Sequence, residues 1–229
     1  MPLKATSTGN AGFLLENAAG RVYIDSFFGK ISGVGGGPIL RGAQAGKADL
    51  ILITHAHPDH LDPAETLAAA RASGAIVAGP AAAIRLLAGK LPPERLLTLE
   101  PPEGRRPPAE AAAAVGKISL KALRTYHASG HNSYLLEMDG VRILHDADNE
   151  HASRHNLAAL GRIDLLLLCP WAGSGAGEFV AALRPGLWAL IHLTDEEIDQ
   201  HRAGDFLPGL IQPVPPGVAA PRGGESLEI

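Results

Sequence analysis

The sequence predicts an α/β protein with a four-layer αββα sandwich, in which two mixed β-sheets are flanked by helices. Two observations predict this architecture. Apolar, strand-like segments alternate with helical segments that carry capping residues, and each half of the chain starts with a hairpin pattern. Two sheets with their helices outside accommodate this order of elements best.

In the first half, a continuous apolar run predicts a strand that is buried on both faces. It is followed by Asp62 as an N-cap, Pro63 at the first helical position and Glu65 at the third, which predicts a helix ending near Ser73. The expected elements are a hairpin of residues 12–15 and 21–25, strands 48–54 and 75–78 around that helix, and a second helix from Pro80.

In the second half, Asp139-Gly140 between two apolar stretches is the strongest short hairpin signal of the chain. Residues 101–108 and the Ala-rich residues 109–114 are predicted to form a surface connection before it. The expected elements are a strand 117–126, hairpin strands 133–138 and 141–145, a helix 152–160, a strand 163–168, a helix 178–183, a strand 187–192 and a helix capped by Thr194.

Composition favours one domain. A chain of 229 residues with 46% hydrophobic residues can bury one large core, so we expect a domain over residues 1–212. The Pro- and Gly-rich tail, 213–229, is expected to be extended or mobile unless a neighbouring subunit holds it. The lone Cys169 lies in an apolar run and is expected to be a small buried hydrophobic residue, not a nucleophile.

Charge and hydropathy limit the classes of partner that we expect. A net charge of -4 and a pI near 6.2 provide no basic face for a polyanion, so nucleic acid is disfavoured. No apolar stretch approaches the roughly 20 residues that span a bilayer, and the N-terminus lacks an apolar signal core. We therefore expect a cytoplasmic protein with no membrane contact and a small-molecule substrate, and the sequence leaves a homo-oligomer open.

A histidine-rich loop carries the chemistry. His55, His57, Asp59 and His60 follow the buried strand directly. Side chains alternate in an extended segment, so His55 and His57 project to one side and can share an ion. Pro58 presets the turn that brings Asp59 and His60 towards a second ion. Imidazole and carboxylate ligands suit zinc, manganese or iron, with zinc as our first choice for both divalent ions.

This His-x-His-x-Asp-His motif after an apolar strand resembles the signature of metal-dependent hydrolases of the metallo-β-lactamase fold. The resemblance extends to the opening hairpin that ends in a structural acid, Asp25, and to the hairpin 132–148, which ends in the bridging acid of the family. It spans nearly the whole chain to about Glu197 and is closest to the short branch that includes sugar-lactone and phosphodiester hydrolases. The chain departs from the family at Ala147, where glycine is usual, and at Asn149, where threonine is usual.

The resemblance implies the ligand set. His55, His57 and His127 would hold one ion, Asp59, His60 and His192 would hold the other, and Asp148 would bridge them. His127 and His131 both flank the position of the family's third motif, and we favour His127 because it has the loop residues needed to cross a cleft. His131 is expected at the rim of the site, as a substrate contact in the catalytic site or as a solvated histidine. Four further histidines, expected at the surface or behind the ligands, receive no role: His145, His151, His155 and His201.

The resemblance thus implies a binuclear hydrolase, which we expect to cleave an ester, lactone or phosphodiester bond. Water bound to metal becomes available as hydroxide at neutral pH, and Asp59 can orient it and carry a proton to the leaving group. A nuclease or RNA-processing enzyme and a non-catalytic metal-binding protein are the alternatives. Substrate identity is expected to depend on two loops, 29–37 and 172–177, and the sequence does not predict it.

Overall fold

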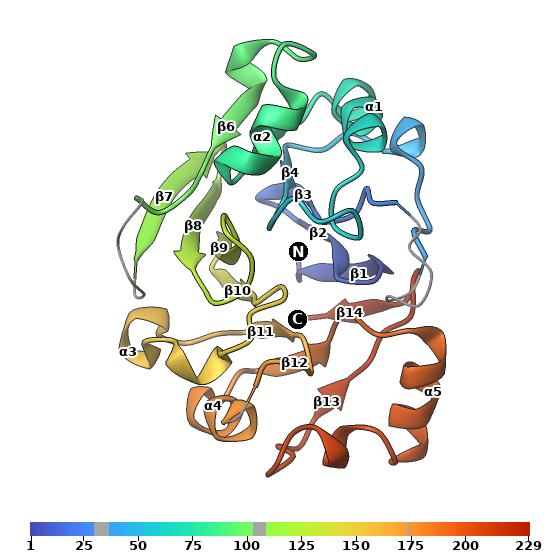
Figure 1. Ribbon diagram of the computed structural model, residues 1–229, viewed down its shortest axis with the longest axis vertical. Coiled ribbons are helices and arrows are strands. Elements are labelled where there is room, and N and C mark those ends of the chain that lie inside the picture. Colours follow the sequence, from blue (N-terminus) through green and yellow to red (C-terminus); the bar gives the residue numbers. More distant parts are fainter. Residues whose placement is uncertain (30–36, 103–108, 174) are drawn as a thin grey trace.

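Two seven-stranded sheets make up the centre of the molecule (Figure 1). The computed structural model describes residues 1–29, 37–102, 109–173 and 175–229, and the counts below apply to that part of the chain. The first sheet has the strand order β14 (Ser226–Glu228), β1 (Lys4–Gly9), β2 (Gly12–Asn17), β3 (Gly20–Ile24), β4 (Leu50–Leu52), β5 (Ile76–Gly79) and β6 (Leu96–Thr98).

The second sheet mirrors the first in size. Its strand order is β13 (Val218–Ala219), β12 (Leu187–Leu190), β11 (Leu165–Leu168), β10 (Val141–His145), β9 (Asn132–Met138), β8 (Ile118–Arg124) and β7 (Glu110–Val115). Both sheets are mixed, because β3 to β6 and β10 to β13 run parallel while the hairpin strands run antiparallel. The predicted pair of mixed sheets is confirmed.

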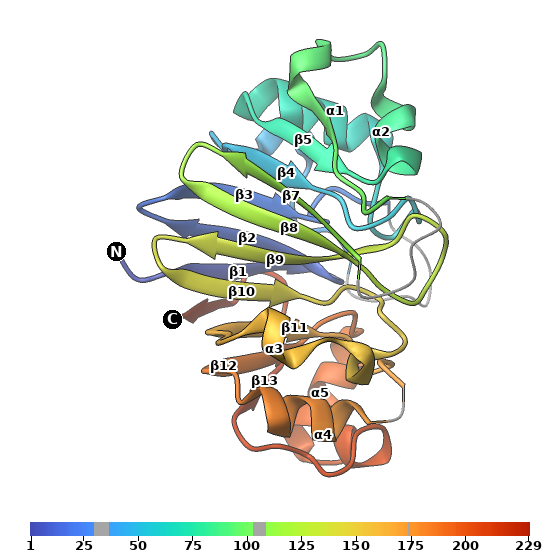
Figure 2. The same cartoon turned by 90° about the vertical axis from the view of Figure 1, so that its left-hand side faces the viewer.

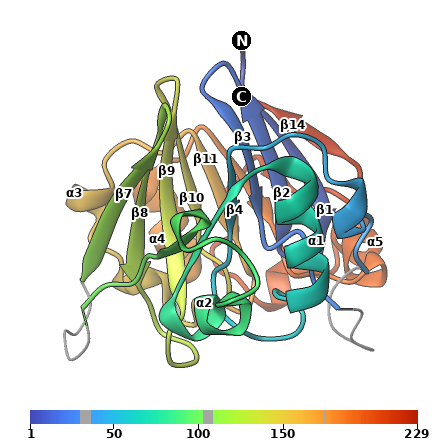
Figure 3. The same ribbon diagram turned by 90° about the horizontal axis from the view of Figure 1, so that it is seen from above.

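Helices cover the outer faces of the sheets, as the views from the side and from above show (Figures 2 and 3). The α-helices are α1 (Pro63–Ser73), α2 (Ala81–Leu87), α3 (Leu157–Leu160), α4 (Ala176–Leu183) and α5 (Asp195–Ala203). Short 3₁₀ turns are η1 (Gly42–Gln44), η2 (Pro93–Arg95), η3 (Ala152–Arg154) and η4 (Leu207–Gly209). None of the helices in the described ranges has both the length and the apolar character that a bilayer crossing requires.

Three apolar clusters hold the layers together. The largest lies between the two sheets and includes Phe13, Tyr134 and Leu165, all nearly inaccessible to solvent. A second cluster packs α1 and α2 against the first sheet, and a third packs α3, α4 and α5 against the second. Because each sheet is covered on both faces, the short parallel strands can be purely apolar, as in the Leu-only strand β11.

Several elements were predicted correctly from signals that span only a few residues. The Asp62 carboxylate accepts hydrogen bonds from the backbone of Ala64 and Glu65 at the start of α1, and Gly74 ends that helix at a φ of 81°. The turn between β9 and β10 has positive φ angles at Asp139 and Gly140, which a tight hairpin requires. These elements were predicted from residues that act over only a few positions.

Other elements differ from the prediction. Residues 109–114 are not a surface connection, because the Ala-rich segment forms edge strand β7 and pairs with β8 along its whole length. The predicted helix 152–160 is split into η3 and α3, and Asn156 caps the second piece. Strand β1 was not predicted at all. Most of the predicted loops 29–37 and 101–108, and residue 174, lie outside the described residues.

The C-terminal segment, expected to be extended or mobile unless a neighbouring subunit holds it, is extended and pairs with strands of its own chain. Val218 and Ala219 extend the second sheet beside β12, and residues 226–228 extend the first sheet beside β1. Leu3 and Ile229 exchange two backbone hydrogen bonds of 3.0 and 2.9 Å. Residues 213–229 therefore contribute to both sheets, and the two ends of the chain lie close together (Figure 1).

Deleting residues 226–229 should lower the free energy of unfolding by about 2–4 kcal/mol, because Leu227 and Ile229 pack against the core between the sheets. Denaturant unfolding would measure the change. Glu228→Ala is the matched control, since its side chain is exposed on the same strand, and it should leave the midpoint unchanged. A truncated protein as stable as the full chain would contradict this account of the tail.

Candidate metal centre

The candidate ligands come from four connections that meet at one end of the sandwich. The loop 55–60 follows β4, His127 lies between β8 and β9, Asp148 follows β10, and His192 follows β12. Parallel strands end at the same edge of a sheet, which places the connections after β4, β10 and β12 at corresponding edges. The fold thus brings together residues that are 137 positions apart (192 minus 55).

Two compact groups of ligand atoms result. His55, His57 and His127 form one group, and Asp59, His60, Asp148 and His192 form the other. Within each group, the candidate ligand atoms lie within 4.8 Å of one another. The structure thus brings together all seven residues that were expected as ligands, and Asp148, expected as the bridge, falls in the second group.

Asp148 lies between the two groups. Its Oδ2 atom is 3.8 Å from Nε2 of both His55 and His127, in the first group. The same oxygen is 3.2 Å from His60 Nε2 and 3.4 Å from His192 Nε2, in the second group. One carboxylate thus faces imidazoles of both groups, which is the placement that a bridging ligand needs.

Hydrogen-bond contacts at Nδ1 orient the imidazoles of three candidate ligands. Nδ1 of His60 donates to the buried Asp25 carboxylate at 2.8 Å, and Nδ1 of His127 lies 2.9 Å from Glu150 Oε1. Nδ1 of His55 lies 3.0 Å from the Thr54 hydroxyl, which itself donates to Asp25 at 2.6 Å. Each contact engages Nδ1, so that Nε2 is the ring nitrogen that faces the other candidate ligands, as in metal sites where a second partner orients the ring.

Three buried polar atoms that lack hydrogen-bond partners in the described part of the chain indicate whether these residues fit metal ions. His55 Nε2, His60 Nε2 and Asp148 Oδ1 are buried, and none has a hydrogen-bond partner among the residues that the structure describes. A buried polar atom without a partner costs about 1–3 kcal/mol, so native proteins seldom leave three together. Metal ions would satisfy these atoms, and the donor set of imidazoles and carboxylates fits them.

The charges of the cluster are strongly coupled. Burial lowers the pKa of His55, and the nearby His60 and His131 imidazoles lower it further. Burial also lowers the pKa of His192, but its hydrogen bonds to Asp148 and Asp59 outweigh burial and raise the pKa to about 9. Burial raises the pKa of the Asp59 and Asp148 carboxyls, yet the close His192 and His60 imidazoles outweigh burial and hold it well below the usual range.

Backbone geometry supports the ligands as well. Asn10 accepts the His192 N–H through its carbonyl and donates from its side chain to the carbonyl of Asp59, at 3.0 and 2.9 Å. Ala147, at the position where glycine was expected, has a φ of 49°, and His192 has a φ of 64°. The left-handed conformation costs an alanine roughly 1–2 kcal/mol, so the surrounding structure must hold Ala147 in place.

Comparison with known proteins agrees with this geometry. A family model described as a beta-lactamase superfamily domain matches residues 4–183. The chain belongs to the beta-lactamase superfamily. A curated relative, a UPF0173 metal-dependent hydrolase of Pelotomaculum thermopropionicum, is 40% identical over 67 residues, which is 29% of this chain and 26% of the relative. The chain thus matches about a quarter of that relative's length.

Solved structures share the fold of this superfamily member at low identity. The metallo-beta-lactamase fold protein YhfI of Bacillus subtilis has a TM-score of 0.69 and 16% identity, with 100% of both chains covered. Igni18, a metallo hydrolase of Ignicoccus hospitalis, has a TM-score of 0.67 and 17% identity, with 100% of this chain and 99% of the other covered. These similarities show a metallo-β-lactamase fold.

The expected place of His131 was wrong. Its side chain does not lie at a rim but is only 1% exposed, behind the ligands. His131 Nε2 accepts the backbone N–H of Asp148 at 3.2 Å, so Nδ1 carries the proton and donates to the Thr125 hydroxyl at 2.8 Å. Burial lowers the pKa of His131 to about 3, which keeps the ring neutral and Nε2 an acceptor. Loop position alone could not reveal this contact.

The other histidines take varied positions. His145 is fully buried and its Nε2 donates to the carbonyl of Ala11 at 2.8 Å, so it is not a surface residue. His155 Nε2 lies 2.6 Å from Asp146 Oδ1, outside both ligand groups. His151 and His201 are partly exposed. Sequence analysis also missed the contribution of Glu150, whose contact with His127 is made across 23 positions of the chain.

His127→Ala should weaken metal binding by at least about tenfold, because it removes a candidate ligand of the more exposed group. His131→Ala should instead lower the stability of the metal-free protein by about 1–3 kcal/mol, because the buried Asp148 N–H loses its acceptor.

Metal titration and thermal unfolding separate the two effects. His131→Gln, which can present an acceptor near the position of Nε2, should recover part of the loss, and equal metal affinities for all variants would contradict these assignments.

Metal binding should release at least about one proton at pH 7.5, because His192, with its pKa of about 9, is protonated there in the metal-free protein. The affinity should rise with pH up to about pH 9, because below that value the proton on His192 competes with the metal. Calorimetric titration in two buffers of different ionisation enthalpy would count the protons. A binding enthalpy that is independent of the buffer would contradict the assignment of His192.

Proposed function

We propose that this protein is a binuclear metal-dependent hydrolase that cleaves an ester, lactone or phosphodiester bond of a small molecule. The observation that carries the proposal is the position of Asp148 Oδ2, between 3.2 and 3.8 Å from four imidazole nitrogens of two ligand groups. A carboxylate in that position offsets the repulsion between two adjacent cations. The name of the curated relative, a metal-dependent hydrolase, agrees with the proposal.

The two groups of candidate ligands would each hold one metal ion. His55, His57 and His127 would hold one ion, and Asp59, His60 and His192 would hold the other, with Asp148 between them. Divalent ions so held would lower the pKa of water to about 7 and polarise the oxygen of the bond under attack. Zinc is our first choice, and manganese and iron are alternatives, because the seven imidazole and carboxylate ligands suit all three metals.

Asp59 is the proposed proton carrier. Its carboxylate is largely buried between His60 and His192, at 3.4 and 3.1 Å from their Nε2 atoms. Neighbouring imidazoles hold its pKa far below neutrality, so the group is ionised and can accept a hydrogen bond from attacking water. Asp59 would orient that water and pass a proton to the leaving group.

The exposed side of the centre supports access for a small substrate. His57 is exposed, and the side chain of His127 retains 20% of its accessible surface, whereas His55 and His60 are buried. A substrate can therefore approach from the side of the first ligand group. The net charge of -4 disfavours a polynucleotide, so we propose a small molecule rather than a nucleic acid as substrate.

The purified protein should contain up to two transition-metal ions per chain and hydrolyse a generic lactone, ester or phosphodiester only when they are bound. Elemental analysis, together with assays before and after chelation, would measure both. A protein that binds no metal after incubation with zinc, manganese and iron would refute the proposal. Two bound ions without hydrolysis across a broad substrate panel would favour a non-catalytic metal-binding protein.

Asp148→Asn should reduce both metal occupancy and kcat/KM, the latter by more than about 100-fold, because even partners of ligands contribute 10- to 100-fold. Asp146→Asn is the matched control. Asp146 is buried two positions earlier, but its carboxylate accepts from Ser133 and lies against His155, outside the ligand groups. If Asp146→Asn rather than Asp148→Asn abolished metal binding, the bridging role would move to Asp146.

A further inference from the structure

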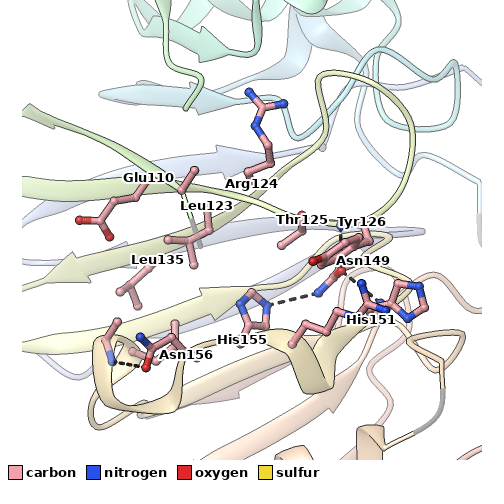
Figure 4. Close-up of a pocket in the computed structure, with 14 residues that line it drawn as sticks. Glu110, Leu123, Arg124, Thr125, Tyr126, Leu135, Asn149, His151, His155 and Asn156 are labelled. Carbon is pink, nitrogen blue, oxygen red and sulfur yellow. Dashed lines mark hydrogen bonds between the residues drawn. The ribbon is translucent and has the colours of Figure 1, made fainter. Parts of the chain in front are cut away.

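A separate cavity of about 250 Å³ lies on the outer face of the second sheet (Figure 4). Strands β8 and β9 form one wall, and the segment of η3 and α3 forms the opposite wall. None of the seven candidate metal ligands lines it. Drug-sized ligands occupy pockets of about 300–1,000 Å³, so this cavity suits a smaller molecule.

One part of the lining is aliphatic. Leu123 and Leu135 line it from the two strands (Figure 4), and Ala159 and Leu160 of α3 line it as well. Leu135 and Leu160 belong to the apolar cluster beneath the helices, and Leu123 packs against it. This part of the cavity would accept a hydrocarbon chain and exclude a strongly hydrated group.

The other end of the cavity carries a cation. The guanidinium carbon of Arg154 lies 4.5 Å from the centre of the Tyr126 ring, and both residues line the cavity. Within residues 1–29, 37–102, 109–173 and 175–229, no carboxylate forms an ion pair with Arg154. The ring positions the guanidinium without neutralising it.

The remaining charged groups of the lining have partners of opposite charge. Arg124 pairs with Glu100 at 3.4 Å, and Glu110 pairs with Lys121 at 3.2 Å. His155 lies against the Asp146 carboxylate, which raises the pKa of the imidazole despite burial and keeps it engaged there. Arg154 is therefore the charge of the described lining that is left for a ligand, and the ligand that complements it is an anion.

We propose that this cavity is a binding site for a medium-chain aliphatic carboxylate, with the chain between Leu123, Leu135 and Leu160 and the carboxylate on Arg154. A guanidinium binds a carboxylate through two parallel hydrogen bonds, which gives Arg154 a specific partner. The site is distinct from the metal centre but adjoins it, because Tyr126 precedes His127 and Asn149 follows Asp148. The proposal does not depend on the hydrolase activity.

Calorimetric titration with butanoate, hexanoate and octanoate tests the aliphatic part. Each methylene that enters the cavity contributes about 0.8 kcal/mol, so the affinity should rise about fourfold per methylene until the chain fills the space. The titrations are made on the metal-loaded protein and repeated after chelation, because a carboxylate can also bind metal ions. One bound octanoate per chain, with unchanged affinity after chelation, supports the cavity site.

Two variants with matched controls test the location. Ala159→Trp fills the cavity from an exposed position of α3 and should abolish binding, whereas Ala158→Trp, on the same helix but outside the lining, should not. Arg154→Gln should weaken octanoate about tenfold or more and leave octanol unchanged. Arg162→Gln removes an exposed arginine that does not line the cavity and should have no effect.

Several results would overturn the proposal. Absence of octanoate binding, or affinity that is independent of chain length, would contradict an aliphatic site. Binding that disappears on chelation would assign the carboxylate to the metal centre. Binding that survives both Ala159→Trp and Arg154→Gln would place it elsewhere on the surface.

Discussion

The buried carboxylate of Asp25 is the constraint on which the metal centre depends. It follows β3 and lies beside the end of β4, where it accepts the backbone N–H and the hydroxyl of Thr54 and the ring N–H of His60. Thr54 then contacts Nδ1 of His55. One buried group thus orients the beginning and the end of the histidine loop, and both imidazoles are left with Nε2 facing the ligand cluster.

Hydrogen bonds within the second sheet likewise hold the segment that carries Asp148. Ser133 at the start of β9 donates to Asp146, and His131 holds the backbone of Asp148. Tyr134 donates to the carbonyl of Ile53 across the core, and the N–H of Asn132 donates to Thr54. Hydrogen bonds therefore cross between the sheets directly beneath the ligands, so that a displacement of one sheet would change the spacing of the two ligand groups.

Much of the fold was predictable because its signals are local. Capping residues around α1 and the Asp139-Gly140 turn act within a few positions, and the histidine motif brings four candidate ligands within six residues. The failures have a common physical cause. β7, with its run of alanines, and the short β14 are stabilised by pairing with distant strands and not by their own propensity.

In the candidate site, too, some residues follow from local signals and others depend on distant partners. The ligands in 55–60 follow from spacing, whereas Asp148 and His192 were assigned only through the resemblance to a known family. The burial of His131 depends on two hydrogen bonds, to Thr125 and to Asp148, which no short motif encodes. Side chains that act behind a site are recognised by the partners that surround them in space, and a single sequence does not present those partners.

The pairing of the first strand with the last has a consequence for the order in which the molecule is assembled. During synthesis, β1 emerges early, but β14, its neighbour in the finished sheet, is made 220 residues later (226 minus 6). Until then, one side of β1 presents unpaired N–H and C=O groups next to the apolar Leu3 and Ala5. The edge of β1 that faces β14 therefore has no partner strand until residues 226–228 have been synthesised.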